Sequence, residues 1–185
     1  MHRTKEPGTP RPRRISVYEM TAFALFAALI FMCDFALDLA MNVELVSTLM
    51  MTFTVVYRRR ALIPIYLYIF LYLCVYGFSV YNAVYLYIWL VLWGVTMLLP
   101  RRMPTGVACV VYPLVCGLFG LSFGALYAPG WALAAGLSFR NMVRWWQMGI
   151  PADIIHAVGN VAFGMLVLPL SRLLLRLDKR LQKAK

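Results

Sequence analysis

Long apolar runs, separated by short clusters of arginine and lysine, are the feature that most constrains what this chain can fold into. Hydrophobic residues make up 63% of the sequence and charged residues only 14%. This pattern is typical of a helical membrane protein and excludes an ordinary water-soluble domain. A membrane-spanning helix needs about 20 residues, so a chain of 185 residues has room for roughly six spans and almost no extramembrane domain.

The runs and their ends predict an all-α integral membrane protein, a six-transmembrane-helix bundle. We expect a disordered basic tail over residues 1–15, a transmembrane domain over 16–175 and a second basic tail over 176–185. Pro129-Gly130 is expected to end the fifth helix, which leaves residues 129–151 as the longest outer loop. The predicted helices cover residues 16–38, 42–57, 61–80, 83–99, 106–127 and 151–170.

The positions of the positive charges predict the orientation. In a six-span bundle the N-terminal tail, Arg58–Arg60, Arg101–Arg102 and Arg172–Lys185 fall on one side, and only Arg140 and Arg144 fall on the other. The positive-inside rule then places both termini in the cytoplasm. The net charge of +11 is explained by orientation and by contact with lipid headgroups, so we do not expect nucleic-acid binding.

Acidic side chains collect at the predicted outer ends of the helices. Asp34, Asp38 and Glu44 belong to the first two helices, and Asp153 begins the last one. A charge at the centre of a bilayer costs about 2.5–3.5 kcal/mol on insertion scales, so it usually faces a cavity or a partner. Asp38 and Glu44 could simply lie in water at the loop. Asp34 is roughly one turn deeper and is the stronger candidate for a ligand-binding group.

Aromatic residues gather at the same predicted outer ends. An interfacial aromatic belt is one explanation. Their coincidence with carboxylates, arginines and the pair His156 and Asn160, which share one helix face, favours instead an aromatic-lined cleft for a small ring-shaped ligand. A structural, hydrogen-bonded His156 is the alternative, and no metal site or cofactor is expected. The predicted ligand-side residues are Asp34, Glu44, Tyr85, Trp89, Arg140, Trp145, His156 and Asn160.

Small residues recur at helical spacing in two of the predicted helices. Ala24 and Ala28 lie four residues apart in the first, and Gly117, Gly120 and Gly124 lie three and four residues apart in the fifth. Such spacing lets two membrane helices approach closely. It predicts either packing inside the bundle or, where the stripe is exposed, a docking face for another membrane subunit.

Together these features resemble the substrate-binding S components of the energy-coupling factor transporters, the vitamin importers of prokaryotes. The resemblance covers residues 16–175 and depends on size, span number and cytoplasmic ends. It also depends on three sequence segments: Ala24-x3-Ala28, Asn42-Val43-Glu44-Leu45-Val46, and Gly149-Ile150-Pro151-Ala152-Asp153-Ile154-Ile155-His156.

The resemblance implies a non-enzymatic binding subunit in a prokaryotic plasma membrane. Its ligand, a vitamin or related micronutrient, would be held near the outer surface by helices 4 to 6 and the outer loops, and the bundle would reorient in the membrane to deliver it. Ala24 and Ala28 would contact a transmembrane coupling subunit that is driven by two cytoplasmic ATPases. The sequence itself contains no phosphate-binding glycine loop, and the specific vitamin is not identified.

Two other classes remain open. Gly120-Leu121-Ser122-Phe123-Gly124, with His156, is similar to the serine and histidine of rhomboid-like intramembrane proteases. That family has glycine directly after its serine, where this chain has Phe123, and the histidine and asparagine of its oxyanion site are missing. A membrane scaffold or assembly subunit without a ligand is the other alternative.

Overall fold

The computed structural model describes residues 15–37 and 45–183, which are mostly helical and contain no β-strand. Residues 1–14, Asp38 and Glu44 lie outside the described part of the chain. The elements in order are α1 (Val17–Leu37), α2 (Val46–Tyr57), η1 (Arg58–Ala61), α3 (Leu62–Tyr76), α4 (Val80–Ala83), α5 (Tyr85–Leu98), α6 (Thr105–Ala135), α7 (Phe139–Gly164) and α8 (Val167–Lys183).

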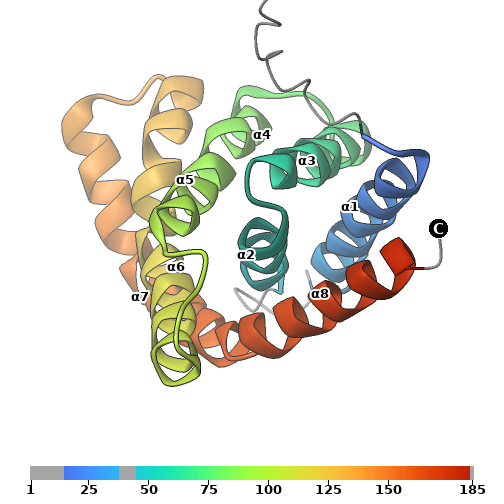
Figure 1. Cartoon of the computed structure of the whole chain (residues 1–185). Coiled ribbons are helices and arrows are strands. Elements are labelled where there is room, and N and C mark those ends of the chain that lie inside the picture. Colours follow the sequence, from blue (N-terminus) through green and yellow to red (C-terminus); the bar gives the residue numbers. More distant parts are fainter. Residues whose placement is uncertain (1–14, 38–44, 184–185) are drawn as a thin grey trace, which may run out of the picture.

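The short helix α2 lies at the centre of the bundle, with α1, α3, α5 and α8 around it (Figure 1). All of its residues from Val46 to Thr54 are buried. Among its buried hydroxyl groups, Thr54 Oγ1 donates to the carbonyl oxygen of Met50 at 2.8 Å, one turn back on the same helix, whereas Thr52 Oγ1 has no partner among the described residues. Such a bond inside the helix lets a polar residue occupy the core of a membrane bundle.

Helices α1 and α2 run in opposite directions. The ring of Phe26 stacks on Phe53 with centroids 4.2 Å apart, and Phe23 meets the edge of Tyr57 at 5.2 Å. Contacts therefore move backwards along α2 as they move forwards along α1. These two aromatic pairs hold the first two helices of the chain together.

Helix α3, by contrast, runs in the same direction as α1. Arg60, just before α3, pairs with Glu19 in the first turn of α1 at 2.6 Å, and Tyr68 reaches Asp34 further along both helices. The chain must therefore reverse between α2 and α3. The reversal lies at Arg58, whose φ of 55° places it in the left-handed region.

Arg58 also closes the end of α5. Its guanidinium group donates to the carbonyl oxygens of Thr96 and Leu99 at 3.3 Å and of Met97 at 2.5 Å. In return the indole N–H of Trp93 donates to the carbonyl oxygen of Arg58 at 3.2 Å. The last carbonyls of a helix have no partner within the helix, so one arginine caps α5 and joins it to the α2–α3 reversal.

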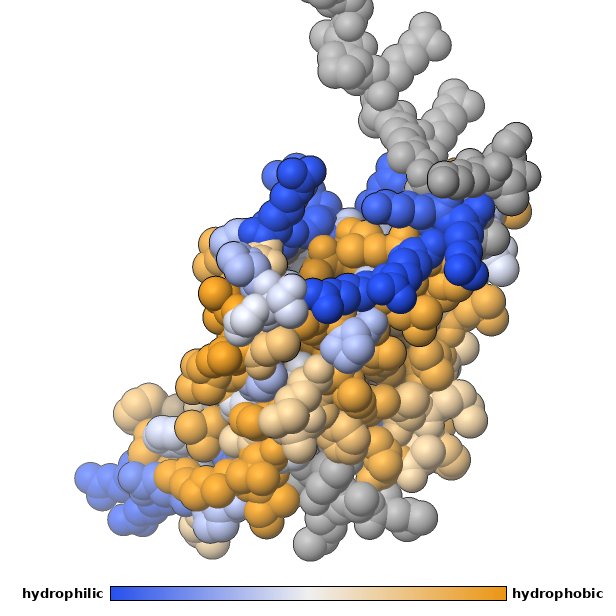
Figure 2. All heavy atoms as spheres, turned by 60° about the horizontal axis from the view of Figure 1, so that its bottom comes forward, coloured by the Kyte–Doolittle hydropathy of each residue, from blue (hydrophilic) through white to orange (hydrophobic). Residues whose placement is uncertain are grey.

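The polar residues occupy two ends of the molecule, with an apolar belt between them (Figure 2). We call one the basic end: it contains the start of α1, Arg58–Arg60, Arg101–Arg102 and Arg172, which donates to Thr105 Oγ1 at 2.5 Å. The other we call the aromatic end. There Tyr127 donates to the carbonyl oxygen of Tyr81 at 3.2 Å, beyond which α7 begins.

These features define a multi-pass, all-α membrane protein. By length and composition, the candidate spans are Val17–Leu37, Val46–Tyr76, Val80–Leu98 and Thr105–Ala135, with a fifth if α7 and α8, which are bent by 43°, count as one. The second candidate contains the reversal at Arg58. Its halves of 12 and 15 residues measure about 18 and 22 Å at about 1.5 Å per residue, shorter than a hydrocarbon core of about 30 Å. Six spans therefore remain a prediction.

The prediction of a long loop over residues 129–151 was wrong. Helix α6 continues through Pro129 to Ala135, and α7 already begins at Phe139 after a turn at Gly136, whose φ is 63°. A proline disturbs the hydrogen bonds of the preceding turn, and in membrane helices neighbouring groups can replace them. Here the hydroxyl of Tyr87 donates to the carbonyl oxygen of Leu126 at 2.6 Å. The predicted loop is therefore a helical hairpin.

Helix α8 lies across the basic end of the bundle (Figure 1). Val167 and Ser171 are buried against the bundle, whereas Arg172 and Arg176 are exposed. Residues 176–183, predicted to be part of a basic tail, continue this helix. An amphipathic helix at the edge of an apolar belt suits the boundary between membrane and water.

Candidate functional site

The pair α6 and α7 forms the most closely packed part of the bundle, because glycines of α6 face side chains of α7. Gly124 lies against Asp153, and Gly117 lies against Val161. A Cβ atom added at Gly120 would lie only 2.6 Å from the amide nitrogen of Asn160 and 3.1 Å from backbone atoms of Ala157. The glycine stripe is therefore packed inside the bundle, which is one of the two outcomes that its spacing predicts.

The face of α7 against this stripe carries polar residues. Asp153, His156 and Asn160 are only 7%, 5% and 0% exposed. Asp153 accepts a hydrogen bond from the backbone N–H of Gly124 at 3.0 Å, and the ring of His156 meets the edge of Phe123 with centroids 5.0 Å apart. The predicted common face of His156 and Asn160 is thus buried against α6.

Asn160 is the most unusual residue of this polar face. Neither its amide nitrogen nor its amide oxygen has a hydrogen-bond partner among the described residues. Burying an amide without partners costs about 1–3 kcal/mol by protein mutational data, and a membrane interior offers no bulk water to relieve that cost. The amide of Asn160 therefore brings two donor hydrogens and an acceptor into the bundle without a partner among the described residues.

A continuous aromatic cluster begins beside this polar face. The ring of Phe123 lies between His156 and Tyr127, and Tyr127 stacks on Trp145 at 6.2 Å. On the opposite side Trp89 contacts Phe123 at 6.2 Å. The cluster joins α3, α4, α5, α6 and α7, and its members are Tyr68, Tyr72, Tyr76, Tyr81, Tyr85, Trp89, Phe119, Phe123, Tyr127, Trp131 and Trp145.

Trp89 provides a second group without a partner. The residue is 1% exposed, and its indole N–H has no acceptor among the described residues. Its ring lies 5.6 Å from Phe119, the residue just before Gly120. We call Trp89, Phe119, Phe123, His156 and Asn160 the interior site, because these residues form a connected set from α5 through α6 to α7.

Asp34 lies at the α3 side of the aromatic cluster. The hydroxyl of Tyr68 donates to Asp34 Oδ2 at 3.0 Å, and the ring of Tyr68 lies 6.2 Å from Trp89. A tyrosine hydroxyl satisfies part of the hydrogen-bonding need of a carboxylate placed among apolar helices. Asp34 is thus connected to Trp89 through a single aromatic residue.

The predicted ligand-side residues separate into groups. Asp34, Tyr85, Trp89, Trp145 and His156 all contact members of the aromatic cluster. Asn160 lies one turn beyond His156. Arg140 is exposed near the start of α7, and Glu44 lies outside the described residues.

Sequence reasoning missed Tyr68 and Phe123, which connect the predicted residues to one another. A signal for Tyr68 was present, because Tyr68, Tyr72 and Tyr76 follow one another at intervals of four. That spacing places their rings on one helix face. The same signal was present for Phe123, because Phe119, Phe123, Tyr127 and Trp131 also follow one another at intervals of four.

The alanine stripe of α1 faces outward. Ala24 and Ala28 are exposed, whereas Phe23, Ala27 and Ile30 on the neighbouring face are buried against the bundle. Their two methyl groups leave a shallow, uncharged strip on the membrane-facing surface of α1. This arrangement is compatible with a docking face.

The serine singled out as a possible nucleophile has a local role in this structure. Ser122 Oγ donates to the carbonyl oxygen of Phe119 at 2.9 Å, and its side chain lines a groove between α5 and α6 together with Val91 and Val95. His156 instead packs against Phe123. This arrangement gives no support to a serine–histidine pair, which needs hydrogen-bond contact between the two groups.

Comparisons with models of protein families, with curated proteins and with solved structures gave no match to this chain.

Proposed function

We propose that this chain is the substrate-binding membrane subunit of an energy-coupling factor-type importer, an S component. It captures a vitamin-like small molecule at the aromatic end and delivers it by reorienting in the membrane. Both termini lie in the cytoplasm of a prokaryotic cell, and the subunit works with a transmembrane coupling subunit and two ATPases. The chain itself carries out no chemical reaction.

One observation carries this proposal: polar groups without partners are buried beside a continuous aromatic cluster. The amide of Asn160 and the indole N–H of Trp89 lie on either side of Phe119 and Phe123. Aromatic faces with a few convergent polar groups suit a small ring-shaped ligand. Other buried polar groups of the described residues, such as those of Thr52 and Ser171, also lack a partner. Those of Asn160 and Trp89 differ because they lie beside the aromatic cluster, and this position favours the binding hypothesis over a scaffold without a ligand.

The distribution of charge agrees with delivery by reorientation. Most cations of the described residues lie at the basic end, and the aromatic end carries Arg140 and Arg144. Moving few fixed charges into the apolar part of a bilayer keeps the cost of such a motion low. The outward alanine stripe of α1 offers a contact surface for the coupling subunit.

The first experiment is to purify the full chain in mild detergent and identify by mass spectrometry any small molecule that remains bound. We expect a vitamin or precursor at one copy per chain. The affinity for that compound is then compared between the wild type, Asn160→Leu and the matched control Asn141→Leu, which makes the same change at an exposed position of α7.

Asn160→Leu is expected to weaken binding more than tenfold while thermal stability stays equal or rises, because an unpaired buried amide is replaced by an apolar group. The control should bind like the wild type. A chain that purifies empty and without coupling or ATPase subunits would favour the scaffold. A loss of stability in Asn160→Leu, with unchanged affinity, would make Asn160 a structural residue and remove the main support of the proposal.

A further inference from the structure

We propose that the substrate is an aromatic cation, bound with its ring beside Tyr127 and Trp145 and its positive charge at Asp153. This inference rests on the proposed function, because it names the chemical class of the molecule that the chain captures. It makes Asp153 of α7, next to the interior site, the residue that selects the charge of the substrate.

The carboxylate of Asp153 is the evidence for a positive charge. The residue is only 7% exposed. One of its oxygens accepts the backbone N–H of Gly124 at 3.0 Å, whereas the other, Oδ2, is buried without a hydrogen-bond partner among the described residues. Burying a carboxylate without a counter-charge is costly, above all in a membrane interior. A ligand that brings a positive charge to Oδ2 would remove that cost.

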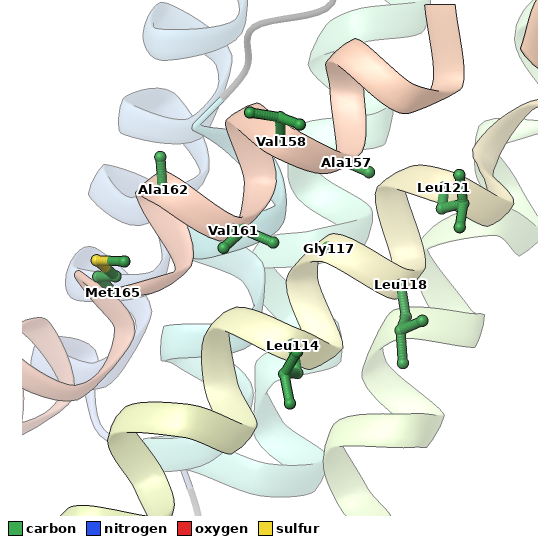
Figure 3. A pocket seen from close by; sticks show the side chains of 9 residues that line it. All are labelled: Leu114, Gly117, Leu118, Leu121, Ala157, Val158, Val161, Ala162 and Met165. Atoms are coloured by element: carbon green, nitrogen blue, oxygen red, sulfur yellow. The ribbon is translucent and has the colours of Figure 1, made fainter. Parts of the chain in front are cut away.

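The surroundings of Asp153 supply no arginine or lysine as a counter-ion among the described residues. Arg144 is exposed and lies nine residues earlier on α7, about 14 Å along the axis at about 1.5 Å per residue. On the outer side of α6 and α7, the groove between them is lined by apolar residues such as Leu118 and Val158 (Figure 3). His156 interacts electrostatically with Asp153 but makes no hydrogen bond to Oδ2. The counter-charge therefore comes from His156 or from a ligand.

The face of α7 that carries Asp153 has room for a ring. Trp145, Gly149 and Asp153 follow one another at intervals of four, which places them on one helix face. A Cβ atom added at Gly149 would meet no atom within 4 Å, whereas one added at Gly124 of α6 would touch the carboxylate of Asp153. The helix pair is thus closely packed at Gly124 and leaves space at the partly buried Gly149.

Aromatic rings lie next to this face. The ring of Trp145 stacks on Tyr127 with centroids 6.2 Å apart, and Tyr127 stacks on Phe123 at 6.4 Å. Aromatic faces attract cations and stack with planar rings. A neutral aromatic molecule would use the rings but not Asp153, and an aliphatic cation would use the carboxylate with less stacking. The two features together select a molecule that has both a ring and a positive charge.

Asp34, the other carboxylate beside the aromatic cluster, is less suited to this role. It is half-buried, and it accepts a hydrogen bond from the hydroxyl of Tyr68 at 3.0 Å. The protein itself therefore meets part of its hydrogen-bonding need, whereas Oδ2 of Asp153 has no partner among the described residues. The sequence favoured Asp34 as the ligand-binding carboxylate, and the contacts favour Asp153.

The test uses three probes that share one ring and differ in charge: the cation 1-methylnicotinamide, neutral nicotinamide and the anion nicotinate. Their affinities for the purified full chain are measured by equilibrium dialysis. We expect the cation to bind at least about tenfold more tightly than the other two, because close charge pairs shielded from water couple strongly. Asp153→Asn keeps an acceptor for the N–H of Gly124 but removes the charge, so it should abolish this preference. The matched control Asp178→Asn, the same change on α8, should keep it.

Two further variants test the space and the competing counter-charge. Gly149→Leu should weaken binding of all three probes, whereas Gly106→Leu, at an exposed glycine of α6 that also has no neighbour within 4 Å, should not. His156→Gln should leave the preference for the cation in place. A preference that appears only in His156→Gln would show that His156 supplies the counter-charge in the wild type, and would overturn the proposal.

Other outcomes would also overturn it. These are equal affinities of the wild type for the three probes, equal effects of Asp153→Asn and Asp178→Asn, or a loss of the preference in Asp34→Asn but not in Asp153→Asn. A co-purified compound that is neutral or anionic at neutral pH would contradict this inference and leave the importer proposal intact. A chain that purifies empty and without coupling or ATPase subunits, and binds none of the three probes, would count against both.

Discussion

The two stripes of small residues in this chain have opposite positions. Gly117, Gly120 and Gly124 of α6 are pressed against α7, so that an added Cβ atom would meet neighbouring atoms at each of them. Ala24 and Ala28 of α1 also recur at helical spacing but are exposed at the surface of the bundle. Helical spacing of small residues therefore serves internal packing in one helix and leaves an exposed surface in the other.

The difference shows how the residues around a stripe of small residues indicate what packs against it. Helix α7 offers α6 side chains that use the space left by glycine, namely Asp153, Asn160 and Val161. On α1 the large residues Phe23 and Ile30 are buried against the bundle, and Ala24 and Ala28 lie on the neighbouring, exposed face of the helix. Small residues beside large buried ones on the same helix indicate a surface that packs against another molecule or against lipid.

Placing the same large side chain in both stripes is the strongest test of whether one is internal and the other exposed. Gly120→Leu should lower the free energy of unfolding by about 3 kcal/mol, the upper range for overpacking, because its Cβ would already meet the backbone of Ala157. Ala24→Leu should change it by less than about 0.5 kcal/mol. Thermal unfolding in detergent, followed by circular dichroism, measures both; equal losses would show that the α1 stripe is also internal.

A size exchange across α6 and α7 sharpens the comparison. Gly117→Ala places a methyl group against the side chain of Val161 and should cost about 1–3 kcal/mol. In a Val161→Ala background that contact is gone, so the cost of Gly117→Ala should fall. The double-mutant cycle is expected to give a coupling of about 0.5–3 kcal/mol. Additive effects would contradict direct contact between these positions.

The smallest effect is expected from two adjacent positions on one helix. Ala27 is fully buried and Ala28 is exposed, so Ala27→Leu should cost about 1–2 kcal/mol by overpacking and Ala28→Leu almost nothing.

Ala28→Trp should spare ligand binding and stability but abolish transport when the chain is expressed with its coupling subunit. Loss of ligand binding in Ala28→Trp would show that the docking face is misplaced.

Much of the fold could be predicted from the sequence, because membrane helices are recognisable by their apolar composition. The apolar runs predict the helices, and the reversal at Arg58–Arg60 follows from the charge cluster between two runs. The predicted stop at Pro129-Gly130 failed, because it assumed that a proline would not be compensated. The hydroxyl of Tyr87, about 40 residues earlier in the chain, donates to the turn before that proline, and local sequence does not reveal such a contact.

The candidate site was predictable in its residue types and less so in its connections. His156 and Asn160 were placed on one face by spacing alone, and the structure buries both on that face. That face is covered by α6 at Gly120 and Gly124. The spacing of residues on α7 does not predict which other helix packs against it. Tyr68, which joins Asp34 to Trp89, appears only when α1, α3 and α5 are brought together.

The three arginines of the α2–α3 turn share one role during membrane insertion and have different roles in the folded protein. During insertion they act together as one block of positive charge, and a lysine at any of the three positions would serve equally well. Once the bundle has formed, Arg58 covers carbonyls of α5, Arg60 pairs with Glu19, and Arg59 remains exposed. At Arg58 the finished molecule uses the planar fork, which reaches three carbonyl oxygens of α5. Tolerance to lysine at these neighbouring positions would therefore separate what the nascent chain requires from what the mature protein requires.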